Sequence, residues 1–209
     1  MIKYILSILF TTQLFAISYP SFTLKQLQSV KTNSGKIAYN RVKDYLKTIY
    51  DYKGLSKQEQ LIRVNTYLNQ FLPQVDQLNQ QCVDYWETPK EFLIIGYGDC
   101  EDYAIIKYYT LLKLGFEKKR LFITTVFEKH SGSYHMVLSY FVNFKKPPLI
   151  LDNLSFRILD LSKRDDLIVD KFINYQGVFK LNKANKLIWV ASSYEKYYNL
   201  LKKIELEKF

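Results

Sequence analysis

A stretch of apolar residues long enough for a helix constrains the fold of this chain more than any other feature. Residues 103–114 are apolar on almost every side, and a helix of that kind is buried in a protein core. Asp99 and Asp102 have the spacing of a capping box, which predicts that the helix begins next to Asp99. Gly115 ends it as a C-cap would. The apolar side chains are Tyr103, Ala104, Ile105, Ile106, Tyr108, Tyr109, Leu111, Leu112 and Leu114.

Cys100 falls in the first turn of this predicted helix. Orphan N–H groups and the positive end of the helix dipole favour a thiolate there, as a cysteine nucleophile requires. Asp99, Glu101 and Asp102 oppose that effect, because negative neighbours raise the pKa of a thiol. A bound cation would reverse the local field, and hard carboxylate oxygens suit calcium. The alternative is that the three acids only cap the helix and complement its dipole.

Cys82 is the other cysteine of the chain. In an oxidising compartment, two cysteines invite a disulfide. A bridge between Cys82 and Cys100 would consume the thiol that is placed for chemistry, so the disulfide and the nucleophile are mutually exclusive predictions. Without the bridge, Cys82 is expected to be a small core residue.

The hydrophobic period changes near Gly115, and this change predicts the fold class. Helical spacing before it and β-branched, aromatic runs after it are typical of an α+β protein, with helices packed on a mainly antiparallel sheet. Asp165–Asp166 is expected to form a solvated turn. The predicted helices are Ser34–Thr48, a helix opened by the Ser56/Glu59 capping box and ending near Pro73, Pro89–Ile95 and Tyr194–Phe209. The predicted strands are Arg120–Glu128, Tyr134–Phe144, Leu149–Leu151, Val178–Leu181 and Leu187–Ala191.

A cysteine nucleophile needs a base and a group that orients the base. Of the two histidines, His130 lies in a polar turn and is expected to be solvated, whereas His135 opens a predicted strand. Asp152 follows the next predicted strand, so two neighbouring strands would bring a carboxylate beside the imidazole. Papain-like and transglutaminase-like folds share this chain order of Cys, His and Asp. The alternatives are a core or edge histidine and an ordinary Asp-Asn turn.

The first sixteen residues have the pattern of an export signal. Lys3 supplies a short positive region, Tyr4–Phe10 is apolar, and Ala16 is a plausible cleavage position; the alternative is an uncleaved anchor. The formal charge of the chain is +10, and removal of Lys3 leaves 10 − 1 = +9. The lysines are scattered rather than arranged in a stripe, so we expect acidic partners or a membrane surface and no nucleic acid. Export predicts a periplasmic location.

Four blocks of sequence carry a family resemblance. They are Trp86–Leu93, Gly96–Ala104, His135–Leu138 and Leu151–Leu154. Together they resemble the bacterial transglutaminase-like cysteine proteinases, which include the LapG-type periplasmic proteases, with consistent spacing from about Leu61 to Gly177. Two segments depart from the family pattern: Gln80–Cys82 stands where a Trp-Gly is expected, and Val169–Asn174 differs.

The resemblance implies a role for each residue of the site. Cys100 would be the nucleophile, His135 the base that becomes a general acid, and Asp152 the group that orients His135. Asp99, Glu101 and Asp102 would bind Ca²⁺, with carbonyl or water oxygens completing the shell of about six to eight ligands. Residues 17–209 would form one papain-like domain, with a helical lobe (about 17–115), a sheet lobe (about 116–209) and the active site in the cleft between them.

The resemblance also implies a substrate and a regulator. The substrate would be the N-terminal region of a large cell-surface adhesin, cut to control biofilm attachment. The regulator would be an inner-membrane receptor for cyclic di-GMP, of the LapD type. Two other functions fit the same residues: a transglutaminase-like acyltransferase, which shares the acyl-enzyme, and a non-enzymatic calcium-binding adaptor that retains the fold.

Overall fold

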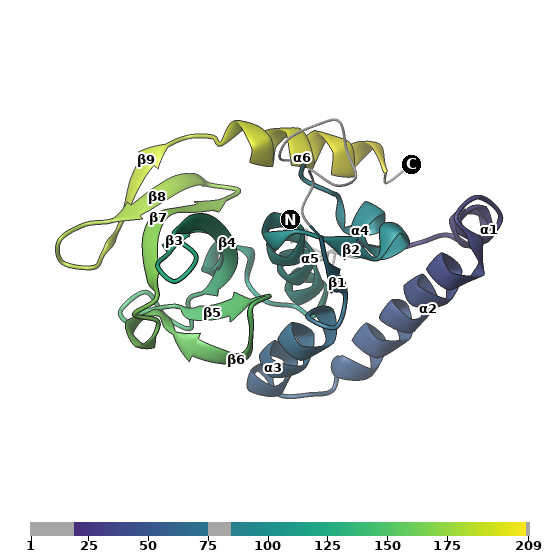
Figure 1. Cartoon of the computed structure of the whole chain (residues 1–209), viewed down its shortest axis with the longest axis horizontal. Coiled ribbons are helices and arrows are strands. Elements are labelled where there is room, and N and C mark those ends of the chain that lie inside the picture. Colours follow the sequence, from purple (N-terminus) through teal and green to yellow (C-terminus); the bar gives the residue numbers. More distant parts are fainter. Residues whose placement is uncertain (1–18, 75–84, 208–209) are drawn as a thin grey trace, which may run out of the picture.

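The computed structural model describes residues 19–74 and 85–207 of the 209-residue chain. The predicted signal peptide, residues 1–16, and Cys82 lie outside the described residues. Helices gather on one side of the molecule and a sheet on the other, with one helix between them (Figure 1). This arrangement confirms the predicted α+β class.

The α-helices begin close to where the sequence predicts. The capping box of Ser56 and Glu59 opens α3, and Thr88 with Glu91 forms a second box at the start of α4. The first helix, over a segment to which the sequence assigned no structure, is also opened by a capping box, at Thr23. The α-helices are α1 (Leu24–Asn33), α2 (Gly35–Tyr52), α3 (Lys57–Leu68), α4 (Pro89–Ile95), α5 (Cys100–Lys113) and α6 (Glu195–Leu206).

Seven antiparallel strands form the main sheet, in the order β6-β5-β4-β3-β7-β8-β9. The sequence predicted five of them; β6 and β7 are additional. The strands are β3 (Leu121–Glu128), β4 (Ser133–Tyr140), β5 (Leu149–Asp152), β6 (Ser155–Asp160), β7 (Leu167–Asn174), β8 (Gly177–Leu181) and β9 (Leu187–Ala191).

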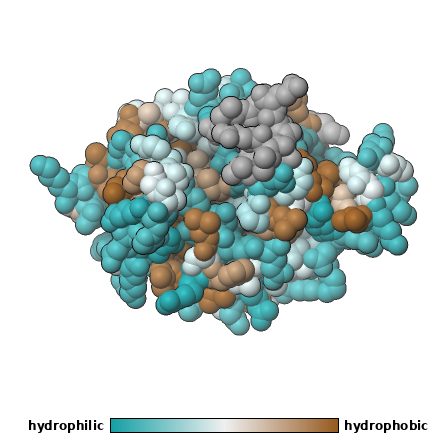
Figure 2. Space-filling model, in the orientation of Figure 1, coloured by the Kyte–Doolittle hydropathy of each residue, from teal (hydrophilic) through white to brown (hydrophobic). Residues whose placement is uncertain are grey.

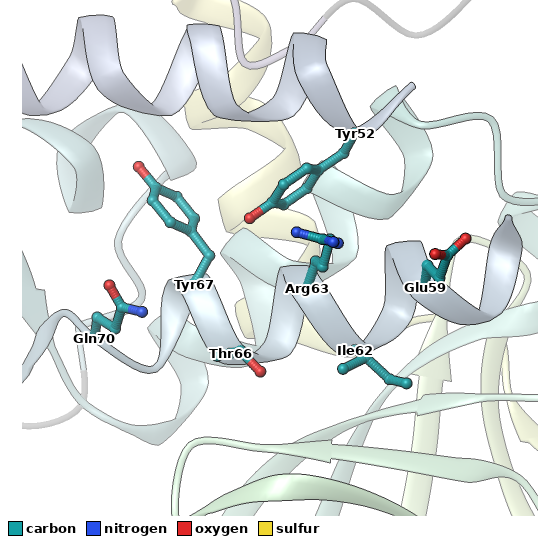
Figure 3. A pocket seen from close by; sticks show the side chains of 7 residues that line it. All are labelled: Tyr52, Glu59, Ile62, Arg63, Thr66, Tyr67 and Gln70. Atoms are coloured by element: carbon teal, nitrogen blue, oxygen red, sulfur yellow. The ribbon is translucent and has the colours of Figure 1, made fainter. Parts of the chain in front are cut away.

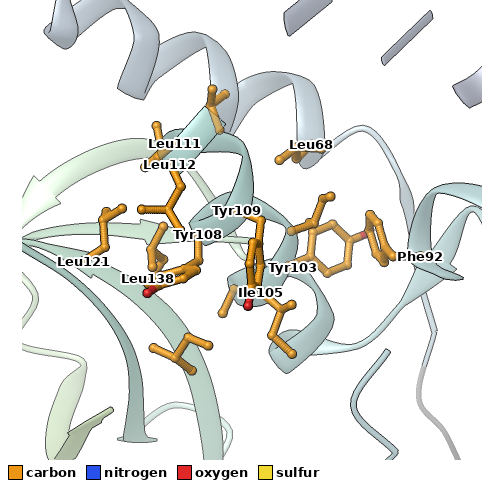
Figure 4. Close-up of a cluster of buried hydrophobic side chains, with 14 of the residues drawn as sticks. Leu68, Phe92, Tyr103, Ile105, Tyr108, Tyr109, Leu111, Leu112, Leu121 and Leu138 are labelled. Atoms are coloured by element: carbon orange, nitrogen blue, oxygen red, sulfur yellow. The ribbon is translucent and has the colours of Figure 1, made fainter. Parts of the chain in front are cut away.

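The helix α5 lies at the centre of the core, as its all-round apolar sequence predicts. It packs against β3, β4 and β5 on one side and against α3 and α4 on the other. Figure 4 shows the tyrosines and leucines of α5 between Leu68 and Phe92 of the helical side and Leu121 and Leu138 of the sheet. Because both layers bury their apolar faces on this helix, its N-terminus is fixed relative to the sheet.

The C-terminal helix α6 runs across the top of the molecule in Figure 1 and packs on the core through Tyr197, Leu200 and Ile204. Among the described residues, none of the helices has both the length and the apolar character needed to cross a bilayer. On the face shown in Figure 2, hydrophobic residues lie scattered among hydrophilic ones.

Candidate active site

The loop before Cys100 is held in place by two glycines. Gly96 ends α4 with a left-handed φ of +90°, which glycine adopts at little cost. Gly98 lies so close to Asp102 that a Cβ atom would come within 2.7 Å of the carboxylate. A short parallel pair, β1 (Leu72–Pro73) with β2 (Tyr97–Gly98), fixes this loop against the end of α3. As a result, Cys100 is the first residue of α5.

The thiol of Cys100 is free and half-buried. It donates a hydrogen bond to Oε2 of Glu101 at 3.3 Å, and the backbone N–H of Met136 is directed at the sulfur. Burial raises the pKa of the thiol, and the charges of Glu101 and Asp99 raise it further. The sulfur therefore lies next to the strand residue that follows His135, in surroundings that disfavour the thiolate.

His135 and Asp152, which lie on neighbouring strands, are in direct contact. Nε2 of His135 lies 2.8 Å from Oδ1 of Asp152, and both side chains are buried. Leu151 pairs with Leu138, so the end of β5 lies beside the middle of β4, close to His135. The sequence therefore predicted this meeting correctly, and Nδ1 is the imidazole nitrogen left for another partner.

Asp152 has two further hydrogen-bond donors. The Leu154 N–H donates to Oδ1 at 2.9 Å, and Nη2 of Arg164 donates to Oδ2 at 2.8 Å. Burial by itself would raise the pKa of Asp152, but the hydrogen bonds and charge of His135, together with Leu154 and Arg164, hold it well below its usual range. Asp152 is thus kept ionised although it is fully buried.

Arg164 is a residue of the site that the sequence did not reveal. It sits just before Asp165–Asp166, which was expected to be a solvated turn, and Asp165 is indeed exposed. Asp166, however, binds Arg164 through two guanidinium nitrogens, Nε at 2.9 Å and Nη2 at 2.6 Å. An arginine next to two acidic residues in a loop is usually part of a surface ion pair. The sequence therefore gives no sign that Arg164 is buried and bound to Asp152.

The three predicted calcium ligands divide into two groups. Asp99 and Glu101 each present a carboxylate oxygen, and these lie within 4.8 Å of one another and of the Cys100 sulfur. Asp102 is buried and points the other way: its oxygens accept the N–H of Glu87 at 2.8 Å and that of Asp99 at 3.1 Å. A carboxylate oxygen has a second lone pair, so these bonds leave Asp102 able to ligate.

The charge of this acidic cluster fits a divalent cation. Burial and then Asp99 raise the pKa of Glu101 to about 9. Burial, with Glu87 and Asp99, raises the pKa of Asp102 well above its usual range. Four buried or half-buried acids therefore meet at the start of α5, and Glu87 is the one that the sequence did not single out. Hard oxygen donors with surplus negative charge are the donor set that calcium prefers.

Comparison with known families decides the identity of the fold. The family described as bacterial transglutaminase-like cysteine proteinase, BTLCP, matches residues 40–191. The chain belongs to this family. The resemblance predicted from the four sequence blocks is thereby confirmed.

Solved structures of Legionella pneumophila LapG resemble this proteinase over most of its length. The calcium-bound form is 32% identical, with a TM-score of 0.76, and the match covers 88% of this chain and 99% of that one. A second LapG structure has a TM-score of 0.73, covering 88% and 97% of the two chains at 32% identity. An EGTA-treated form has a TM-score of 0.72 at 32% identity, covering 85% and 96%. No curated protein sequence matches the chain.

Other features of the proteinase lie outside this constellation. His130 is exposed in the turn between β3 and β4, as predicted. A surface pocket between the end of α2 and α3 is lined by Tyr52, Arg63 and Tyr67 among others, with Arg63 6.0 Å from the Tyr52 ring (Figure 3). Its lining contains none of the candidate triad, Arg164 or the acidic cluster at the start of α5.

A buried lysine of the proteinase provides a test of the core next to the site. Lys107 of α5 is fully buried, and its Nζ makes no hydrogen bond within the described part of the chain. Burial lowers its pKa to about 7, opposed by the charge of Asp152. In the unfolded chain the Lys107 amine is protonated below about pH 10.5. The free energy of unfolding therefore decreases as pH falls from about 10.5 to about 7, and Lys107 causes no further change below about pH 7.

Lys107→Met is therefore expected to stabilise the proteinase by about 1–4 kcal/mol at pH 6 and by less at pH 9. Urea unfolding at the two pH values measures the difference. Lys47→Met is the control, because Lys47 is exposed and pairs with Asp51 on the surface of α2. Its effect should stay within about 0.5 kcal/mol. Destabilisation by Lys107→Met at pH 6 would show that the buried ammonium is well satisfied.

Proposed function

We propose that this proteinase is a calcium-dependent periplasmic cysteine endopeptidase in which Cys100 is the nucleophile, His135 the general base and Asp152 the orienting carboxylate. The contact between His135 and Asp152 carries the proposal. It occurs in a member of a cysteine proteinase family, on the strand whose Met136 N–H meets the sulfur at the start of a buried helix. A base with a fixed tautomer beside a helix-borne thiol is the minimum that thiol catalysis needs.

The reaction would proceed through a thioester. His135 takes the thiol proton as the sulfur attacks the carbonyl carbon of the scissile peptide. The imidazolium then gives that proton to the leaving amine, and the C–N bond breaks. Water attacks the thioester while His135 removes its proton, and the proton returns to the sulfur as the carboxylic acid leaves. The backbone N–H of Cys100, at the N-terminus of α5, would help to stabilise the oxyanion.

Asp99, Glu101 and Asp102 would hold the calcium ion. Their support is the half-buried Asp99 and buried Glu101 that lie together at the start of α5, with the buried Asp102 behind them. A 32%-identical LapG was also solved with calcium bound. Bound there, calcium would supply positive charge next to the sulfur. The thiol of Cys100 donates its hydrogen bond to Glu101 and not to His135. A calcium ion that bound the Glu101 carboxylate would compete for that acceptor and favour loss of the thiol proton.

The adhesin substrate and the regulator rest on family membership. We propose the N-terminal region of a large cell-surface adhesin as the substrate, cleaved to control biofilm attachment. Sequestration by an inner-membrane cyclic di-GMP receptor of the LapD type would regulate the cleavage. The periplasmic location is supported by the export-signal pattern of residues 1–16.

The decisive experiment incubates the protein with the N-terminal segment of an adhesin encoded in the same genome. Cleavage is expected in Ca²⁺ and should fall at least about 10-fold in EGTA. Added Ca²⁺ should restore it, whereas Mg²⁺, which demands tighter octahedral geometry, should not. Glu101→Gln should raise the Ca²⁺ concentration needed, and the exposed Glu117→Gln should leave it unchanged. Full cleavage in EGTA would refute the calcium proposal, and incorporation of a labelled amine in excess of hydrolysis would indicate a transferase.

A further inference from the structure

A chain of polar contacts continues from His135 beyond Asp152. Oδ1 of Asp152 faces the imidazole, while Oδ2 accepts from Nη2 of Arg164. The same guanidinium donates to Asp166: Nε of Arg164 lies 2.9 Å and 3.1 Å from the two carboxylate oxygens of Asp166. Four side chains, from β4, β5 and the turn before β7, are therefore linked in series as His135, Asp152, Arg164 and Asp166.

The two oxygens of Asp152 have different partners: Oδ1 contacts His135, and Oδ2 accepts from Arg164. A carboxylate that bonded only to the imidazole could rotate about its Cβ–Cγ bond and exchange its oxygens. The charge-assisted bond to Arg164 removes that freedom, because the planar guanidinium is itself fixed by a fork-like contact with Asp166. Orientation of Oδ1 toward His135 is therefore set from two sides: the Leu154 N–H donates to Oδ1 itself, and Arg164 holds Oδ2 on the far side of the carboxylate.

The contact with Arg164 also stabilises the negative charge of Asp152, which burial would otherwise disfavour. The carboxylate is fully buried, and an isolated charge in that position would protonate or leave the site. Arg164 is 9% exposed, so its charge is poorly screened by water. The buried Lys107 also attracts Asp152 but makes no hydrogen bond within the described residues, so it cannot fix an orientation.

From these contacts we infer that Arg164, braced by Asp166, is a positioning residue that holds Asp152 ionised and aims its Oδ1 at His135. The inference deepens the proposed function and rests on it for the consequence in catalysis. Arg164 is nearly buried and its bonds go to Asp152 and Asp166, so it acts on His135 through Asp152 and not on the substrate.

The first test is kinetic. Arg164→Met should lower kcat for adhesin cleavage by about 10–100-fold, the usual effect of removing an outer partner, with KM little changed. Arg164→Lys keeps the charge but cannot reproduce the fork, so it should recover part of the loss. Asp166→Asn should give a smaller loss than Arg164→Met, since Arg164 still reaches Asp152. Arg157→Met, an exposed arginine on β6, is the matched control and should behave as the unmodified protein.

The second test needs no substrate. The imidazole N–H that bonds to Asp152 should give a downfield proton resonance, assigned to His135 by its loss in His135→Gln. Arg164→Met should broaden or shift this resonance while the fold, checked by thermal unfolding, persists; if Arg164→Met does not fold, Asp166→Asn and Arg164→Lys carry the same test.

An unchanged resonance together with unchanged kcat in Arg164→Met would overturn the inference while leaving the protease proposal intact. If the unmodified protein cleaves no adhesin, the protease proposal fails. Loss of the resonance in Arg164→Met would then still establish the positioning role.

Discussion

Cys100→Ala is expected to abolish adhesin cleavage, with kcat/KM falling by about 10⁴–10⁶-fold. Alanine cannot form the thioester, and removal of a nucleophile from a triad costs about as much as removal of the whole triad. Oxyanion stabilisation by the N-terminus of α5 would remain, which sets the floor of residual activity. Cleavage of a purified adhesin segment under Ca²⁺, followed over time on a gel, measures the loss.

Two controls make this result specific to the thiol of Cys100. Cys82→Ser removes the other cysteine and should leave cleavage unchanged, which a disulfide between the two would not allow. Calcium binding by Cys100→Ala should persist, because Asp99 and Glu101 are retained. A Cys100→Ala protein that still released the adhesin in cells would instead support a calcium-binding adaptor.

The parts of this fold that the sequence predicted are local. The apolar run of residues 103–114 and the Asp99/Asp102 spacing predicted both ends of α5 to within a residue. They could do so because a helix cap and a buried helix both depend on residues close together in the sequence. The predicted helix Pro89–Ile95 has the bounds of α4, and proline in its first position, after the Thr88 N-cap seen in the structure, accounts for that start. The contact of His135 with Asp152 was predicted from two adjacent strands joined by a short turn, which is also a nearly local feature.

The missed parts depend on distant contacts. The sequence of β7 places Asp170 and Lys171 in the middle of the strand, which breaks the apolar alternation expected of a strand beside β3. Those charges are tolerated because Asp170 pairs with Lys171 and with Lys180 of β8. The role of Arg164 depends on its contact with Asp152 at the end of β5. That contact forms only in the folded sheet, so no local sequence pattern around Arg164 predicts it.

Asp152→Asn is expected to lower kcat by about 10³–10⁴-fold, although the side chain keeps its shape. Both oxygens of Asp152 accept hydrogen bonds, Oδ1 from His135 and the Leu154 N–H, and Oδ2 from Arg164. Asparagine offers only one oxygen. The guanidinium is a charged donor and the Leu154 N–H a neutral one, so that oxygen should turn to Arg164. The amide NH₂ then faces the imidazole. His135 must accept at Nε2, which places its proton on Nδ1, the nitrogen that should receive the thiol proton.

This argument predicts a difference between substitutions at one position. Asp152→Asn reverses the tautomer, whereas Asp152→Ala only frees the imidazole, so the alanine variant should retain more activity if it folds. Asp170→Asn is the matched control, because Asp170 pairs with lysines at the surface of β7 and should alter cleavage little. Nitrogen-15 NMR of His135 reports the tautomer directly in the absence of substrate. An Asp152→Asn protein with the original tautomer and normal kcat would remove Asp152 from the triad, since orientation of His135 would then have another source.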